Sequence, residues 1–142
     1  MRDYLFRGKR KDNGEWVYWN IYGEFCTSKG RRTRLTRKTY CSEKYFYHID
    51  EIKQLIDPET VGQYTGLTDK NGKKIFEGDI VKSCEYDDVY FVKYFDNDNY
   101  SAFDCVPDVP LCECNGLSYL VNEEGCKVIG NIYDDKEILD VK

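Results

Sequence analysis

The sequence predicts a mainly β fold that is built from several short antiparallel strands and hairpins, with one or two short helical pieces. Aromatic residues make up 15% of the 142 residues, and Tyr and Phe favour strands because their stiff rings pack well on a pleated surface. Alanine, the strongest helix former, occurs only at Ala102. Two Asn-Gly pairs, Asn13-Gly14 and Asn71-Gly72, are strong hairpin signals, and a type I′ turn with both residues at positive φ is expected at each.

The N-terminal half begins with the first predicted hairpin, formed by residues 4–10 and 15–25. Residues 26–39 are polar and basic without apolar periodicity, so a loop is expected there. Residues 40–49 are rich in aromatic side chains and predict another strand. Apolar residues at helical spacing then predict one or two helical turns before Pro58.

The C-terminal half alternates short apolar segments with turn residues. Strands are expected over residues 61–67, 73–76, 80–82, 89–95, 100–106, 117–121 and 127–133, and a helical turn over 134–139. Glu77-Gly78-Asp79 is similar to the turn that enters the first strand of SH3-like barrels, so a small barrel over residues 77–133 is a further expectation. The chain is expected to form a single domain over residues 1–142, with an N-terminal hairpin part (1–56) and a C-terminal barrel-like part (57–142).

Three sets of motifs carry a resemblance to a known family. The stretch over residues 57–81 is DPETVGQYTGLTDKNGKKIFEGDIV, residues 128–133 are VIGNIY, and the chain opens with FRGKR (6–10) and NGEWV (13–17). These motifs resemble those of the YopX family of phage and prophage proteins. The resemblance implies a mainly β fold and a phage or prophage origin, but it supplies no reaction and no catalytic residues.

The cysteines bear on compartment and on metal binding. The sequence contains no run of about 18 apolar residues, the length that a transmembrane span needs. The N-terminus lacks the apolar stretch of a signal peptide. We therefore expect no membrane association and a location in the cytoplasm of the bacterial host, where the seven cysteines are free thiols. The candidate zinc ligands are Cys105, Cys112, Cys114 and Cys126, although one residue between Cys112 and Cys114 is fewer than zinc knuckles use. No cofactor is expected.

Enzymatic activity finds little support in the sequence. The chain lacks phosphate-binding loops and hydrolase signatures, and His48 is its only histidine. Six carboxylates could face one hydrolase cleft but are interpreted as solvated turns: Glu85, Asp87, Asp88, Asp96, Asp98 and Asp104.

Charge is strongly segregated along the chain. Residues 1–60 carry 13 Lys/Arg against 9 Asp/Glu, whereas residues 61–142 carry 8 against 17. Six cations without an acid among them form the basic segment, which comprises Lys29, Arg31, Arg32, Arg34, Arg37 and Lys38. The leading hypothesis is a non-enzymatic phage accessory protein that works by binding or by self-association. The alternative is an accessory protein whose basic segment binds nucleic acid, because phosphate attraction needs only such a patch.

Overall fold

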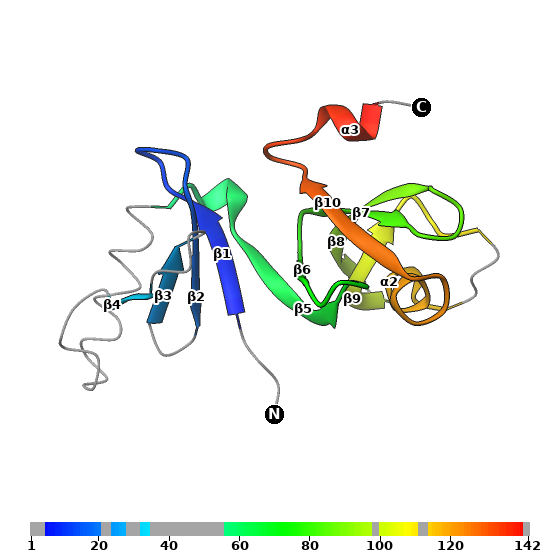
Figure 1. Ribbon diagram of the computed structural model, residues 1–142. Helices are drawn as coiled ribbons and strands as arrows, with labels where there is room; N and C mark the ends of the chain where they lie inside the picture. Colours follow the sequence, from blue (N-terminus) through cyan, green and yellow to red (C-terminus); the bar gives the residue numbers. More distant parts are fainter. Residues whose placement is uncertain are drawn as a thin grey trace. The chain divides into compact units, whose positions relative to one another are not determined.

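A computed structural model describes residues 5–20, 24–27, 32–34, 56–97, 100–110 and 114–140. The chain divides into two compact units, Met1–Tyr64 (unit 1) and Thr65–Lys142 (unit 2), and each is described by itself. Strands dominate the described residues, and the registered strand pairs in both units are antiparallel (Figure 1). The predicted mainly β fold is therefore confirmed.

Unit 1 is a sheet in the order β4-β3-β2-β1-β5. Its strands are β1 (Leu5–Lys9), β2 (Trp16–Asn20), β3 (Glu24–Thr27), β4 (Arg32–Arg34) and the beginning of β5 (Gly62–Thr68). A 3₁₀ turn, η1 (Pro58–Thr60), precedes β5 and is capped by the Asp57 side chain, which accepts the Glu59 N–H at 3.1 Å. The small core of this unit joins Val17, Ile56 and Trp19.

Two predictions for unit 1 were wrong in detail. The strand expected over residues 15–25 ends at Asn20, and β3 pairs back against β2 with Phe25 opposite Trp19. Residues 32–34, expected in a loop, form β4 on the far edge of β3. Each addition gives the preceding edge strand partners for its backbone N–H and C=O groups, a requirement that side-chain periodicity does not reveal. The strand and helical turns predicted over residues 40–55 lie outside the described residues.

Unit 2 contains the end of β5 beside β6 (Lys74–Phe76), and a four-stranded sheet in the order β10-β7-β8-β9. These four strands are β7 (Asp79–Ser83), β8 (Val89–Asn97), β9 (Tyr100–Val106) and β10 (Cys126–Asn131). Because β10 and β9 stand at opposite ends of this order, the described strands form an open sheet. They do not form the closed SH3-like barrel that the sequence suggested.

Both Asn-Gly turns differ from the expected type I′ geometry. Gly14 (φ +70°) and Gly72 (φ +81°) have positive φ, but the preceding asparagines do not, whereas type I′ requires positive φ at both positions. In the second turn the Gly72 N–H donates to the Asp69 carbonyl at 3.0 Å, and the Asp69 N–H donates to the Lys73 carbonyl at 2.8 Å. This pattern is that of a three-residue hairpin loop whose last residue is left-handed.

One predicted strand of unit 2 is helical. Residues 117–121 lie in α2 (Gly116–Tyr119) and the π-turn η2 (Leu120–Glu124) that continues it. The Asn115 side chain caps α2 by accepting the Ser118 N–H at 2.8 Å. Leu117 and Leu120, three residues apart, are both fully buried, so helical spacing rather than strand alternation serves the core. The helical turn expected near the C-terminus is confirmed as α3 (Glu137–Asp140).

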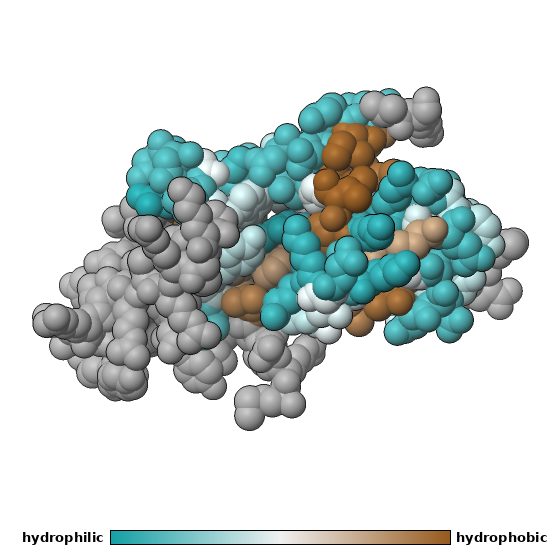
Figure 2. Space-filling view, in the orientation of Figure 1, coloured by the Kyte–Doolittle hydropathy of each residue, from teal (hydrophilic) through white to brown (hydrophobic). Residues whose placement is uncertain are grey.

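The core of unit 2 lies between its sheet and the α2–η2 segment. Its buried members are Ile75, Val81, Tyr90, Val92, Cys105, Val109, Leu117, Leu120 and Cys126. The described surface in view is mostly hydrophilic, with separate hydrophobic patches (Figure 2). None of the helices in the described ranges is both long and apolar enough to cross a membrane.

Candidate functional site

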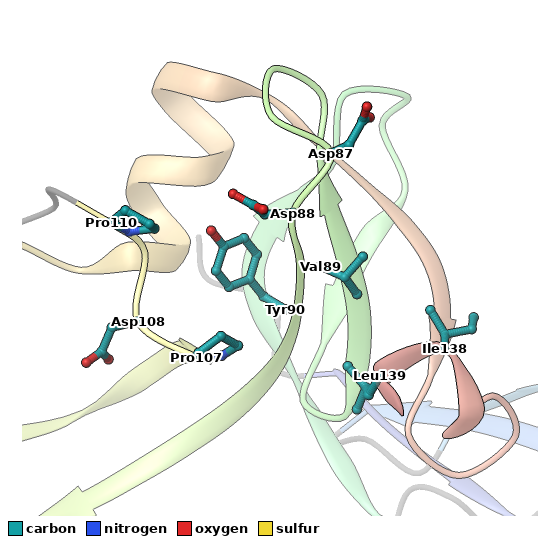
Figure 3. Close-up of a pocket in the computed structure, with 9 residues that line it drawn as sticks. All are labelled: Asp87, Asp88, Val89, Tyr90, Pro107, Asp108, Pro110, Ile138 and Leu139. Carbon is teal, nitrogen blue, oxygen red and sulfur yellow. The ribbon is translucent and has the colours of Figure 1, made fainter. Parts of the chain in front are cut away.

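A cleft of about 520 Å³ opens in unit 2 between the start of β8, the loop after β9 and helix α3 (Figure 3). Carboxylates stand beside apolar side chains around it, so the cleft combines negative charge with hydrophobic walls. Its lining consists of Asp87, Asp88, Val89, Tyr90, Pro107, Asp108, Pro110, Ile138 and Leu139. We call this site the acidic cleft.

The acidic side of the cleft is built by the tight turn between β7 and β8. The buried Ser83 hydroxyl accepts the Glu85 N–H at 3.3 Å and donates to the Glu124 carboxylate at 2.6 Å. The Ser83 N–H donates to the Asp88 carbonyl at 2.8 Å, which closes the turn. Asp87 takes a left-handed backbone (φ +59°), a conformation that Asp tolerates better than most residues. The sequence thus fixes two adjacent carboxylates at the start of β8.

The opposite wall is the loop that follows β9. Val109 is buried and anchors this loop close to the start of α2, where a Cβ at Gly116 would come within 2.9 Å of its Cγ2 atom. Pro107 and Pro110 restrict the backbone on both sides because their rings fix φ. Asp108, exposed between them, is therefore held on a stiff loop.

Helix α3 supplies the third wall. The Asn131 side chain accepts the Tyr133 N–H at 3.0 Å, and the Asp135 carboxylate accepts the Asn131 N–H at 3.2 Å. These bonds order the turn between β10 and α3. Ile138 and Leu139 follow on the helix, half-buried, and present apolar surface to the cleft.

Tyr90 is the unusual member of the lining. Its side chain is only 2% exposed and belongs to the core, yet its hydroxyl makes no hydrogen bond with any described residue. In Figure 3 the ring points toward the side of the cleft where Asp88 lies. Burial, and then the charges of Asp88 and Glu124, raise the pKa of Tyr90 to about 12, so the phenol stays protonated near neutral pH. The hydroxyl oxygen itself is open to the cleft and is not among the buried, unpartnered side-chain polar atoms of the described residues.

These groups can bind a cationic ligand. The described lining consists of carboxylates, apolar side chains and one phenol. Carboxylates and a neutral hydroxyl can accept hydrogen bonds from a cationic donor. Apolar walls beside them suit the aliphatic stem of a Lys or Arg side chain, which prefers apolar contact while its charged head is paired.

Part of this site was predictable from the sequence. Of the six carboxylates interpreted as solvated turns, only Asp87 and Asp88 line the cleft among the described residues. Asp104 instead serves the fold, because its carboxylate accepts the Tyr100 hydroxyl at 2.9 Å, and Asp98 lies outside the described residues.

Two contributors to the cleft were missed. Asp108 had a local signal in its position between two prolines, which predicts a stiff, exposed loop. Tyr90 had none, since a tyrosine within an apolar strand is expected in the core.

The candidate zinc ligands differ in burial. Cys105 and Cys126 are buried free thiols, Cys114 is an exposed one, and Cys112 lies outside the described residues. Within the described ranges, no three or more His, Cys, Asp and Glu side chains gather as a metal would require.

The basic segment is only partly described. Arg32 and Arg34 lie in β4, where their backbones pair with Cys26 and Glu24 of β3. The other four cations, Lys29, Arg31, Arg37 and Lys38, lie outside the described residues.

Comparison with known proteins defines the class. The sequence matches the model of the family described as "YopX protein" over residues 5–140, nearly the whole of this antiparallel, mainly β chain. This chain belongs to the YopX family. No curated protein matches it. Among solved structures it is similar to the crystal structure of protein EF1440 from Enterococcus faecalis, with 34% identity and a TM-score of 0.42. That match covers 56% of this chain and 55% of the other, so it spans little more than half of either.

Proposed function

We propose that this chain is a phage- or prophage-encoded accessory protein of the bacterial cytoplasm that acts by binding and self-association. In this proposal the acidic cleft of one copy takes the basic segment of a second copy. The observation that carries the proposal is Tyr90, whose side chain is nearly fully buried and whose hydroxyl has no partner, at a cleft that also presents Asp88 and Asp108.

Charge complementarity identifies the occupant. The basic segment holds six of the 21 Lys and Arg residues. The rest of the chain has the other 15 and all 26 Asp and Glu residues, so it is strongly acidic. A cationic side chain from this segment would place its charge between Asp88 and Asp108 and its stem against Leu139. The Tyr90 hydroxyl would accept one of its N–H groups. Each copy offers both a segment and a cleft, so a reciprocal exchange closes into a dimer.

The test measures the mass of the full-length chain in solution at low salt. We expect a dimer that dissociates as salt rises, because exposed ion pairs are screened. Tyr90→Phe should weaken association about fivefold, since one hydrogen bond contributes a net ~1 kcal/mol. The double variant Asp88→Asn/Asp108→Asn should be monomeric. Asp96→Asn, an exposed carboxylate of β8 outside the cleft, is the matched control and should still dimerise.

A labelled peptide with the sequence of residues 28–39 provides a second readout. It should bind the full-length protein and lose affinity in the same cleft variants. An unchanged affinity in the Asp88→Asn/Asp108→Asn variant, or a monomeric native chain that ignores the peptide, would overturn the proposal.

A second candidate function follows from the density of cations in the basic segment, six within ten residues. If the segment binds nucleic acid, the affinity for an oligonucleotide must fall steeply with salt. Replacing Arg31, Arg32, Arg34 and Arg37 with Ala should then abolish that binding. If the segment docks on another copy, the same variant should instead change the assembled mass, while oligonucleotides bind the native segment negligibly.

A further inference from the structure

We propose that unit 2 carries a second site, the lysine hollow, that binds the phosphate group of a nucleotide, either free or within a nucleic-acid strand. The hollow measures about 370 Å³, and its lining consists of Lys70, Lys82, Ser83, Cys84, Asp87, Lys127 and Ile129. Asp87 lines both this hollow and the acidic cleft, whereas the three lysines line the hollow alone, and the proposal does not depend on the function proposed above.

The three lysines come from three elements that hydrogen bonds hold together. Lys82 on β7 and Lys127 on β10 are directly opposite each other in the antiparallel register. Lys70 belongs to the turn before β6, and its N–H donates to the Cys126 carbonyl at 2.9 Å, which fixes that turn to β10. The convergence of these side chains is thus set by the backbone.

This arrangement is unfavourable for the fold itself. Like charges directly opposite in a strand pair are destabilising. Lys82 has one long ion pair, 3.8 Å from its Nζ to Asp87, with both side chains largely exposed (43% and 83%). The Lys70 and Lys127 ammonium groups have no ion pair or hydrogen bond within the described part of the chain. Even with Asp87 counted, the hollow keeps surplus positive charge, and an anion bound there would relieve the repulsion.

The hollow also has an apolar side. Ile129, at the bulge of β10, is 38% exposed and lines the hollow together with Lys127. The exposed Cys84 thiol lies in the same hollow. A ligand that joins phosphate to a sugar or base satisfies both features, since its charge meets the lysines and its less polar part meets Ile129. The volume is near the lower limit of small-ligand pockets, which fits a single nucleotide unit.

The experiment uses the full-length chain with Arg31, Arg32, Arg34 and Arg37 changed to Ala, so that the basic segment does not contribute. Binding of pyrophosphate, thymidine monophosphate and a labelled oligothymidylate is measured by titration. Lys70→Gln/Lys127→Gln should weaken binding of these ligands about tenfold or more, and should reduce the salt slope for the single-stranded oligonucleotide by about 1.4. Lys93→Gln/Lys136→Gln removes the same charge from exposed positions outside the hollow, and should leave binding unchanged.

Cys84 reports the position of the ligand. Bound ligand should slow alkylation of Cys84 but not of Cys114, which is also exposed, as followed by peptide mass spectrometry. Lys127→Glu should raise the melting temperature while abolishing binding, because it replaces a repulsive cross-strand pair with an attractive one. Protection by thymidine monophosphate assigns a free nucleotide, and protection by the oligonucleotide alone assigns a strand. The site would be refuted if the Lys70→Gln/Lys127→Gln variant bound these ligands as tightly as the protein that keeps both lysines. It would also be refuted if no ligand protected Cys84.

Discussion

The Tyr90 hydroxyl gives the acidic cleft a signature that can be measured without a ligand. Because the hydroxyl makes no hydrogen bond with described residues and is open to the cleft, Tyr90→Phe removes only a solvent-accessible polar group from an otherwise buried side chain. We expect the free energy of unfolding to stay within about 0.5 kcal/mol of the native value. Denaturant unfolding checks this. A loss of about 2 kcal/mol or more, roughly the contribution of a hydrogen bond to a charged group, would indicate a hidden partner and remove the main support for the cleft.

Gly72 tests the corrected turn geometry. Its φ is +81°, and a Cβ added at this position would have no neighbouring atom within 4 Å, so a side chain there meets backbone strain but no clash. Gly72→Val should lower stability by about 1–2 kcal/mol, because a β-branched residue resists the left-handed region. Gly72→Asn is the matched control and should lower it clearly less. Thermal melts that rank the two variants equally would contradict the turn.

At the residue scale, the sequence predicted positions that depend on local chemistry and missed those that depend on packing. Gly14 and Gly72 were recognised because glycine beside asparagine has a local meaning in turns. Their exact turn class was not, since in the second turn the hydrogen bonds of Asp69 decide it. Tyr90 was missed because only the three-dimensional surroundings show that this core tyrosine lines a cleft.

At the scale of elements, Asp69 joins the turn before β6 to β10. Its carboxylate accepts the backbone N–H groups of Asn71 (2.9 Å), Lys73 (2.8 Å) and Val128 (3.0 Å). Burial alone would raise the pKa of Asp69, but the bonds from Val128, Lys73 and Asn71 outweigh it and lower this pKa below its ordinary value. The charged carboxylate therefore stabilises the fold above the unfolded pKa of about 3.9, and this stabilisation is lost as pH falls through the lower folded pKa.

Asp69→Asn tests this link. The amide can keep one acceptor, but its NH₂ group would face a backbone donor, so we expect a loss of about 1–3 kcal/mol at neutral pH. The difference from the native chain should shrink as pH falls below about 4, because the native carboxylate then becomes protonated. Urea unfolding at several pH values measures this. Asp96→Asn is the control, and a pH-independent difference for Asp69→Asn would contradict the assignment.

Strands rich in β-branched and aromatic residues were predicted well. Elements that depend on pairing with a neighbouring strand or on packing against the core were not. The segments that became β8 and β9 carry β-branched and aromatic residues along their length, and both were placed correctly. The α2–η2 segment was mistaken for a strand because five residues with two leucines fit either period. Its Asn115 cap, rather than its apolar content, was the available signal.

At the scale of the whole molecule, charge and thiols are both unevenly distributed. The C-terminal half is acidic overall, yet the lysine hollow lies within unit 2, so net charge along the sequence did not reveal it. The sequence showed only that the basic segment lies in the N-terminal half and that the C-terminal half carries excess acid. It did not show the acidic cleft. Which carboxylates meet depends on β8, the loop after β9 and α3, which are distant in the chain.

The cysteines provide a prediction for the molecule as a whole. Cys84 and Cys114 are exposed, whereas Cys105 and Cys126 are buried, and burial raises the pKa of Cys126 to about 11. Since the thiolate is the reactive form, iodoacetamide should modify Cys84 and Cys114 quickly and Cys105 and Cys126 only after unfolding. Cys84→Ser, which changes an exposed position, should remove one fast site and leave the slow ones unchanged.

In denaturant without reductant, all seven cysteines should react if the chain resides in a reducing cytoplasm. Stable disulfides in the freshly isolated protein would argue against that compartment. The Cys126 thiol is enclosed by the core of unit 2, so rapid labelling of Cys126 in the native state would show that the sheet opens at β10.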